Sequence, residues 1–102
     1  MLIYNTTYAV EKQELASFIN WVREIMIPAV HAEGTLHSGR LTHILDNRSE
    51  SESISLSLQF CVKDSAALHG WYLSQGRELQ KQMKKVFGDR VMGFPTLMEV
   101  IE

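Results

Sequence analysis

The chain is short of cysteine and proline, and each shortage excludes a class of protein. Its one cysteine, Cys61, cannot form an internal disulfide, and a single thiolate is too few for a zinc-finger type of site. The two prolines and six glycines are scattered over 102 residues, and no Gly-, Pro- or Ser-rich linker separates two halves. A chain of this length builds one hydrophobic core, so we expect a single domain over residues 1–102.

The chain also lacks a large excess of charge of either sign and has no long apolar run. Ten Lys and Arg residues stand against twelve Asp and Glu residues, and the formal net charge of -2 disfavours non-specific binding to nucleic acid or anionic lipid. No apolar run reaches the length of about 18 residues that a membrane span requires, and the N-terminus lacks the pattern of a signal peptide. With so little cysteine, these features predict a cytoplasmic protein that binds neither nucleic acid nor membrane.

Alternation of apolar and polar residues predicts strands. The clearest is 53–62, where Ile, Leu, Phe and Val alternate with Ser, Gln and Cys, so that one face is apolar. β-Branched and aromatic residues predict another strand over 2–10. The remaining strands are expected over 36–45 and 91–101, and the polar stretch 46–52 is expected to be an exposed hairpin loop.

Two stretches have the three- and four-residue spacing of amphipathic helices. The first covers about 15–26, and because Pro28 cannot donate a backbone hydrogen bond, we expect a short separate helix after it that ends at Gly34. The second begins after Asp64 as its N-cap and ends at Gly88. Its apolar stripe predicts the burial of Leu68, Trp71, Tyr72, Leu79, Met83 and either Val86 or Phe87.

The resulting order is strand, helix, strand, strand, helix, strand. Each strand–helix–strand unit makes a right-handed crossover, and the loop between the units joins the middle strands as a hairpin. These units combine into an α+β, ferredoxin-like βαββαβ fold, in which a four-stranded antiparallel sheet carries both helices on one face. The first strand is expected to present Leu2, Tyr4, Tyr8 and Val10 to the helices.

The last strand is apolar on both sides, although the helices cover only one. We expect Met92, Phe94 and Met98 to form an uncovered stripe on the open face, and such stripes mark interfaces. The simplest solution is a homodimer in which two chains pack their open faces together. The alternative is that the helix ends or the terminus of the same chain cover the stripe.

Polar residues are expected in the middle of the same open face. They are Asn5 and Thr7 of the first strand and Ser57 and Gln59 of the third. Because an interface made only for stability would place apolar residues there, these four are candidates to bind a small molecule between the two sheets. Arg40 or His43 is expected to add a charge, although their opposite parity leaves open which one faces inward. The alternative is that the four polar side chains hydrogen-bond one another and leave no cavity.

The four histidines do not form a recognisable metal site. No HExxH pair is present, and no cysteine pair accompanies the histidines. His37 and His43 share a parity in the second strand, but their spacing separates them by about 20 Å. We therefore expect no metal and no cofactor.

Nucleotide and RNA sites are also not indicated. The sequence contains neither a P-loop nor the glycine motif of dinucleotide-binding folds. RNA-recognition modules of this topology stack bases on aromatic residues of the third strand. In this chain the only aromatic residue of 53–62 is Phe60, which belongs to the helix-facing set.

Short motifs give the chain a resemblance to a known family. They are Ile3-Tyr4-Asn5, Trp21, Ile27-Pro28-Ala29-Val30 followed by Gly34, and Thr96-Leu97-Met98-Glu99-Val100. On these motifs the chain resembles, nearly end to end, an uncharacterised bacterial family, domain-of-unknown-function family 4286. The resemblance implies a ferredoxin-like fold in the style of the dimeric α/β barrels and no established activity. The family often has histidine before its Ile-Pro pair, where this chain has Met26, so no role is carried over from that histidine.

Two functions remain open. The first is a homodimeric binding or interaction module whose small-molecule ligand occupies a polar-lined cavity between the sheets. The alternative is a monooxygenase-like dimeric α/β-barrel enzyme acting on a small organic substrate. Such enzymes use an asparagine on the first strand and a tryptophan on the second helix, positions similar to those of Asn5 and Trp71. The histidine that their haem-degrading members add is absent from 79–83, and Trp71 also fits the core stripe of its helix.

Overall fold

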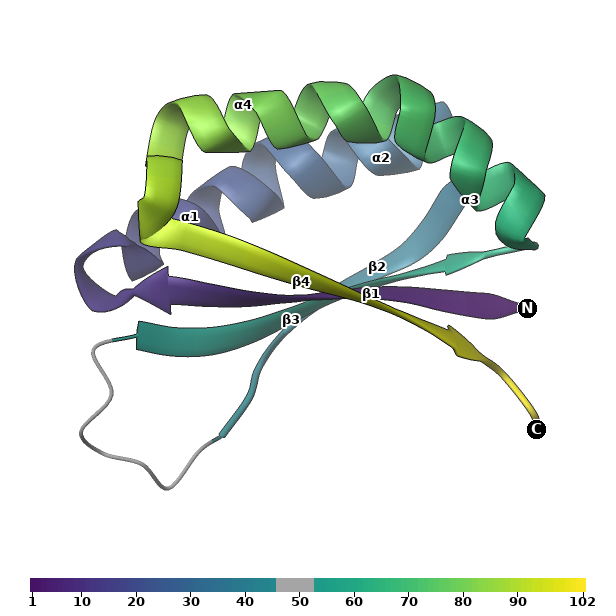
Figure 1. Cartoon of the computed structure of the whole chain (residues 1–102), viewed down its shortest axis with the longest axis horizontal. Coiled ribbons are helices and arrows are strands. Elements are labelled where there is room, and N and C mark those ends of the chain that lie inside the picture. The colour runs from purple at the N-terminus through teal and green to yellow at the C-terminus, as the bar shows by residue number, and fades with distance from the viewer. Residues whose placement is uncertain (46–52) are drawn as a thin grey trace.

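The computed structural model describes residues 1–45 and 53–102, whose strands form a four-stranded antiparallel sheet (Figure 1). The spatial order of the strands is β2-β3-β1-β4, and each neighbouring pair is antiparallel. The strands are β1 (Leu2–Glu11), β2 (Leu36–His43), β3 (Ser53–Val62) and β4 (Val91–Glu99). The predicted hairpin loop over 46–52 lies outside the described residues.

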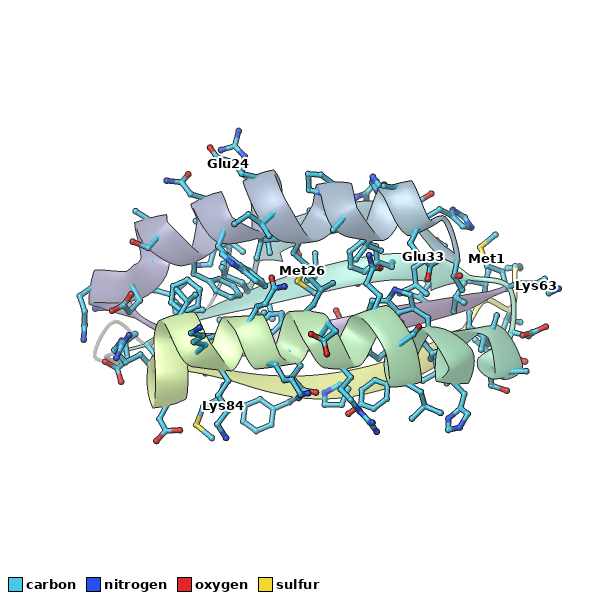
Figure 2. All side chains as sticks on the ribbon, turned by 90° about the horizontal axis from the view of Figure 1, so that it is seen from above. Met1, Glu24, Met26, Glu33, Lys63 and Lys84 are labelled. Carbon is cyan, nitrogen blue, oxygen red and sulfur yellow. The ribbon has the colours of Figure 1, made fainter. Side chains whose placement is uncertain are left out.

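Two helical segments lie side by side on the same face of the sheet (Figures 1 and 2). The first consists of α1 (Leu15–Trp21), the π-helical turn η2 (Val22–Met26) and α2 (Ile27–Glu33). The second consists of α3 (Ser65–Trp71), the π-helical turn η3 (Tyr72–Gly76) and α4 (Arg77–Phe87). Short 3-10 turns, η1 (Lys12–Glu14) and η4 (Gly88–Arg90), connect these segments to β1 and β4. The predicted ferredoxin-like βαββαβ fold is confirmed.

Pro28 divides the first segment differently from the expected break. The helix changes character near residue 26 as predicted, but the backbone stays helical through Ile27, and Pro28 occupies the first turn of α2. Because proline has no N–H to donate, the wider π turn before it absorbs the missing bond without breaking the helix. Gly34, with a φ of 93°, ends α2 in the left-handed conformation, as predicted.

The second segment begins and ends where the sequence predicts. The Asp64 carboxylate accepts a hydrogen bond from the Ala67 N–H at 2.8 Å, and α4 ends at Gly88, which has a φ of 58°. The prediction for Tyr72 was wrong, because this side chain is 42% exposed. Its ring lies at the edge of the pocket described below, where no side chains cover it completely. Of the two alternatives at the end of the stripe, Phe87 is buried and Val86 is 50% exposed. Among residues 1–45 and 53–102, no helix combines the length and the apolar content needed to cross a membrane.

The hydrophobic core fills the space between the helical segments and the sheet. Phe18 of α1 packs edge-on against Tyr8 of β1 at 5.1 Å and against Phe87 of α4 at 5.5 Å between ring centroids. Leu58 and Phe60 of β3 are each 2% exposed beneath them. Burying a side chain of this size contributes about 1.5–3 kcal/mol relative to leaving it in water. The core therefore joins both helical segments to the central strands.

A bulge in β2 reverses the direction of its side chains. His37 pairs with Cys61, but the register then shifts, so that Arg40 pairs with Gln59 and His43 with Leu56. One extra residue in a strand moves every later side chain to the other face. The expectation that the two histidines share a face was therefore wrong: His37 and Arg40 lie on the open face, whereas His43 lies on the helix-covered side.

Candidate functional site

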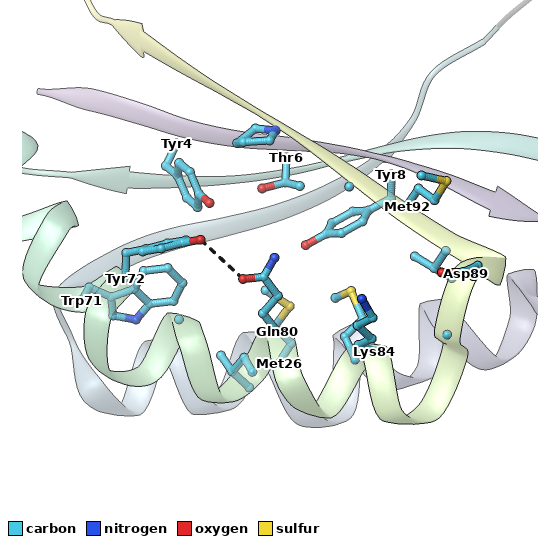
Figure 3. Close-up of a pocket in the computed structure, with 17 residues that line it drawn as sticks. Tyr4, Thr6, Tyr8, Met26, Trp71, Tyr72, Gln80, Lys84, Asp89 and Met92 are labelled. Carbon is cyan, nitrogen blue, oxygen red and sulfur yellow. Dashed lines mark hydrogen bonds between the residues drawn. The ribbon is translucent and has the colours of Figure 1, made fainter.

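A pocket with a volume of about 280 Å³ lies between the β1–β4 side of the sheet and the second helical segment (Figure 3). Residues from β1, β4, η2, α3, η3, α4 and η4 surround it, so segments from both halves of the chain build one site. A second depression at the other end of the fold is more open to solvent and has no aromatic side chain in its described lining. The first pocket is thus the better-formed binding site.

The sheet wall of the pocket is a row of hydroxyl groups. Tyr4, Thr6 and Tyr8 occupy alternate positions of β1, so all three point toward the helices. Gly93 and Pro95 of β4 pair with Tyr8 and Thr6. A Cβ at position 93 would lie 2.9 Å from the Tyr8 ring, so the absence of a side chain allows this ring to lie across β4.

The floor of the pocket is apolar. Met26 comes from η2 in the first helical segment, and Leu79 and Met83 come from α4 in the second. All three side chains are buried, and Figure 2 shows Met26 between the two helical segments. Thioether side chains adapt to irregular shapes and contact aromatic rings favourably, so this floor suits an apolar or aromatic group.

Trp71 closes one end of the pocket and is held there from several sides. Its indole N–H donates to the Gln75 side-chain oxygen at 2.7 Å, and the Gln75 amide donates to the Ala29 carbonyl at 2.8 Å. The Trp71 ring meets Tyr4 edge-on, with 6.1 Å between the centroids. A Cβ at Gly76 would lie 2.8 Å from the same ring. These contacts fix Trp71 as part of the wall.

The rim of the pocket is polar. The Tyr72 hydroxyl donates to the Gln80 side-chain oxygen at 3.5 Å, a long bond at the exposed edge. Lys84 and Asp89 carry the formal charges among the described lining residues. Both π-helical turns reach the pocket, one through Met26 and the other through Tyr72, and π turns occur frequently at functional sites.

The tyrosine hydroxyls of the sheet wall stay protonated at neutral pH. Burial raises the pKa of Tyr8 well above its usual value, with a smaller contribution from the neighbouring Tyr4, and the hydrogen bond with Thr6 offsets this in part. Burial also raises the pKa of Tyr4, and its hydrogen bond with Thr6 again lowers it in part. A protonated phenol both donates and accepts hydrogen bonds, so this wall can donate hydrogen bonds to a ligand at neutral pH.

The polar residues expected on the open face do lie there, away from the pocket. The Ser57 hydroxyl donates to the Asn5 side-chain oxygen, and the Asn5 amide donates to the Thr7 hydroxyl at 3.2 Å. Asn5 and Ser57 are only 8% and 7% exposed. Gln59 pairs with Asn5 in the strand register. Three of the four candidates are thus hydrogen-bonded to one another, along β1 and across to β3, as in the arrangement considered as the alternative to a ligand site.

The structure separates the two residues proposed to add a charge. Arg40 shares the open face with Gln59, whereas His43 pairs with Leu56 and lies on the helix-covered side. Their opposite parity separates them, and the bulge between His37 and Arg40 decides which of the two reaches the open face. Of the two, Arg40 is therefore the candidate on the open face.

The stripe of β4 is present on the open face. Met92, Phe94 and Met98 pair with the β1 residues whose side chains point away from the helices. They are 54%, 55% and 37% exposed within one chain. The described helix ends and C-terminus therefore leave this stripe in contact with solvent.

Asn5 and Trp71, the pair on which the monooxygenase alternative depends, lie on opposite sides of the sheet. Asn5 points to the open face and bonds Ser57, whereas Trp71 borders the pocket on the helix side. The sheet itself separates them, so they do not contribute to one site. Within the part of the chain that the structure describes, no group of three His, Cys, Asp or Glu side chains is placed to hold a metal ion.

The sequence predicts that several of the pocket residues belong to the packed core, namely Tyr4, Tyr8, Trp71, Tyr72, Leu79 and Met83. The period-two pattern places Tyr4 and Tyr8 on the helix-covered face, which is correct, but it does not tell whether the facing space is filled. Two signals were present: Thr6 is polar at a helix-facing position of β1, and Gly93 and Pro95 lack bulk at the paired positions of β4. A polar residue opposite small ones indicates unfilled space.

The comparisons with known proteins agree with the fold. The sequence matches the family described as a domain of unknown function (DUF4286) over residues 1–101. A crystal structure of an EthD (ethyl tert-butyl ether) family protein from Bacillus halodurans C-125 is similar to this chain, with a TM-score of 0.67 and 13% sequence identity. The match covers 99% of this chain and 100% of that chain, and at this identity it shows the fold alone. A comparison with curated proteins finds no match.

Proposed function

The chain belongs to the domain-of-unknown-function family DUF4286. For this member of the family we propose that it binds a small organic molecule and works as a homodimer. The observation that carries the proposal is the pocket of about 280 Å³ on the helix-covered side. Small-molecule sites usually have volumes of about 300–1,000 Å³, so this pocket suits a ligand of one or two rings. The single cysteine is compatible with a reducing compartment, and we propose the cytoplasm as the setting.

The walls of the pocket support binding because they are rigid and because they combine apolar and hydrogen-bonding surfaces. Gly76 and Gly93 each leave room for a fixed aromatic ring, that of Trp71 or Tyr8, so the shape is present before a ligand arrives. A preformed shape avoids the ordering cost that a flexible site incurs on binding. The apolar floor and the hydroxyl row of β1 together resemble the usual composition of ligand sites, in which a few polar groups orient an apolar body.

Binding is better supported than acid–base catalysis. Neither histidine nor cysteine is among the described residues that line the pocket, and the raised pKa values of Tyr4 and Tyr8 keep their hydroxyls protonated. These groups act as hydrogen-bond donors rather than as bases at neutral pH. The separation of Asn5 from Trp71 leaves the monooxygenase alternative without a shared site.

The homodimer is supported by the chemistry of the open face. Met92, Phe94 and Met98 expose an apolar stripe that a second copy of the chain would cover. Beside the stripe, Asn5 and Ser57 already satisfy each other. A polar group buried without a partner costs about 1–3 kcal/mol, so this mutual bonding lowers the cost of packing two such faces together.

A matched pair of variants tests the pocket. Gln80→Trp places a large ring at the rim, whereas Gln82→Trp places the same ring on an exposed position of α4 outside the lining. Saturation-transfer NMR with a panel of one- and two-ring aromatic amides, alcohols and acids measures binding. We expect members of the panel to bind the wild type and Gln82→Trp, and to lose binding in Gln80→Trp. Absence of binding to the wild type, or equal binding by both variants, contradicts the proposal.

A further inference from the structure

The charges and donors around the pocket indicate which class of ligand it takes. We infer that the ligand is an organic anion, with an aromatic or other apolar body on the methionine floor and a carboxylate held at Lys84. This inference rests on the proposed function because it concerns the same pocket. Its first support is the distribution of charge along the second helical segment.

Helix α4 is strongly basic in a chain whose formal net charge is -2. It contains Arg77, Lys81, Lys84 and Lys85 and one acidic residue, Glu78. Lys81 pairs with Glu78 at 3.7 Å, whereas Lys84 makes no ion pair with any residue of 1–45 and 53–102. A free ammonium group at the mouth of a pocket attracts an anion.

Lys84 is placed to serve the pocket rather than the surface between the helices. Figure 2 shows it on the side of α4 that faces away from the first helical segment, and it belongs to the pocket lining. In Figure 3 it stands between Gln80 and Asp89 along the rim. A carboxylate beside Lys84 would therefore also be near the Gln80 amide, a further donor.

The sheet wall opposite Lys84 adds neutral donors. The hydroxyls of Tyr4, Thr6 and Tyr8 face the same space (Figure 3). A carboxylate accepts hydrogen bonds through both oxygens and donates none, so it matches a pocket in which donors predominate. Hydrogen bonds to a charged acceptor are also roughly twice as strong as those between neutral groups.

Asp89 is the one described lining residue that opposes an anion. It lies beyond Lys84, in η4, at the end of the rim away from Gln80. Its charge would direct a carboxylate toward the Gln80 side of Lys84. An Asp89→Asn variant removes this opposing charge and should therefore not weaken the binding of an anion.

The apolar floor accounts for the other end of the ligand. Met26, Leu79 and Met83 are buried, whereas Gln80 and Lys84 are exposed, so polarity rises from the floor to the mouth. A two-ring aromatic acid has the same gradient, with its rings inward and its carboxylate outward. 2-Naphthoate and its neutral counterpart 2-naphthamide have nearly the same shape, and they differ in the group that Lys84 would bind.

Isothermal titration of these two probes, in low-salt buffer, tests the inference. We expect the wild type to bind naphthoate about five-fold more tightly than naphthamide, a size that suits an ion pair at an exposed lysine. Lys84→Gln should remove this preference and leave naphthamide binding unchanged. Lys81→Gln, the control on the same helix, should keep the preference, and Asp89→Asn should not weaken naphthoate binding. Melting curves confirm that each variant is folded.

The outcomes separate this inference from the proposed function. If naphthamide binds as tightly as naphthoate and Gln80→Trp blocks both, the pocket binds ligands but not anions, and the inference is wrong. Equal losses in Lys84→Gln and Lys81→Gln also contradict it, because the effect is then one of general charge. Weaker naphthoate binding in Asp89→Asn contradicts it too. If neither probe binds the wild type, the inference fails, and the panel measurement decides the proposed function independently.

Discussion

His31 of α2 accepts a hydrogen bond from the backbone N–H of Gly39, in the bulge of β2, at 3.0 Å. The imidazole also meets the Phe60 ring edge-on, with 6.1 Å between the centroids. A helix side chain therefore fixes the extra residue of the bulge. The bulge turns Arg40 to the open face and His43 to the helix side, so the contact supports the strand geometry on which that placement depends.

The first prediction concerns Gly39. A Cβ at this position would lie 2.7 Å from the Phe60 ring and 3.0 Å from the His31 Nε2 atom, and both neighbours are held in place. We expect Gly39→Ala to lower the free energy of unfolding by about 1–3 kcal/mol, as overpacking usually does. Gly70→Ala is the control, since nothing lies within 4 Å of its added Cβ, and in a helix it should stabilise by about 0.5–1 kcal/mol. Urea unfolding measures both, and a Gly39→Ala protein as stable as the wild type would refute the packing.

The second prediction concerns alkaline pH. Burial raises the pKa of Tyr8 above the ordinary phenol value of 10.0, so the folded state holds the proton more tightly than the unfolded state does. The stabilisation is therefore complete below pH 10 and is lost as the pH rises beyond it, by about 1.4 kcal/mol for each pH unit. Tyr8→Phe should flatten this decline. Unfolding by urea between pH 8 and pH 11 gives the slopes, and identical slopes for the two proteins would falsify the assignment to Tyr8.

The third prediction is the dimer. Light scattering at micromolar concentration should return about twice the chain mass of 11.7 kDa. Glutamate at both Met92 and Phe94 should give a monomer or an insoluble protein, because it places charges in the apolar stripe. Val86→Glu changes a comparably exposed apolar residue of α4 and should leave the dimer intact. A monodisperse wild-type monomer would refute the prediction of a homodimer and, with it, that of a dimeric α/β barrel.

The fourth prediction is that RNA does not bind specifically. Phe60, the aromatic residue of β3, is 2% exposed and faces the helices, so β3 offers no ring on the open face for a base to stack on. The net charge of -2 adds no general attraction to phosphate. Fluorescence anisotropy with short labelled RNAs at about 150 mM salt should show no saturable binding. Micromolar or tighter saturable binding would contradict this prediction.

Local patterns were enough to predict most of the fold. The strict alternation over 53–62 identified β3 and its apolar face, and Asp64 and Gly34 marked helix ends by their own capping chemistry. Such signals act over a few residues, so they are readable without knowing the tertiary structure. The same two-residue period, applied to the last strand, predicted that Met92 and Phe94 lie on the open face.

The bulge and the pocket were not predictable in this way. The bulge is in contact with His31 of α2 and Phe60 of β3, which meet at Gly39 only once helix and strands have packed together. The pocket depends on how far α4 stands from Tyr8 and Gly93, and periodicity gives the direction of a side chain but not the space before it. Tyr72 shows the difference. It lies on the side of its helix that the pattern predicts, but its ring borders the pocket and is 42% exposed instead of buried.

Pro95 in β4 and the bulge in β2 also bear on how copies of the chain meet at high concentration. These two strands are the outer strands of the sheet, where unpaired N–H and C=O groups invite strand addition by another chain. Proline supplies no N–H at one outer strand, and the bulge interrupts the ladder geometry at the other. Both outer strands thus resist sideways growth of the sheet into fibrils.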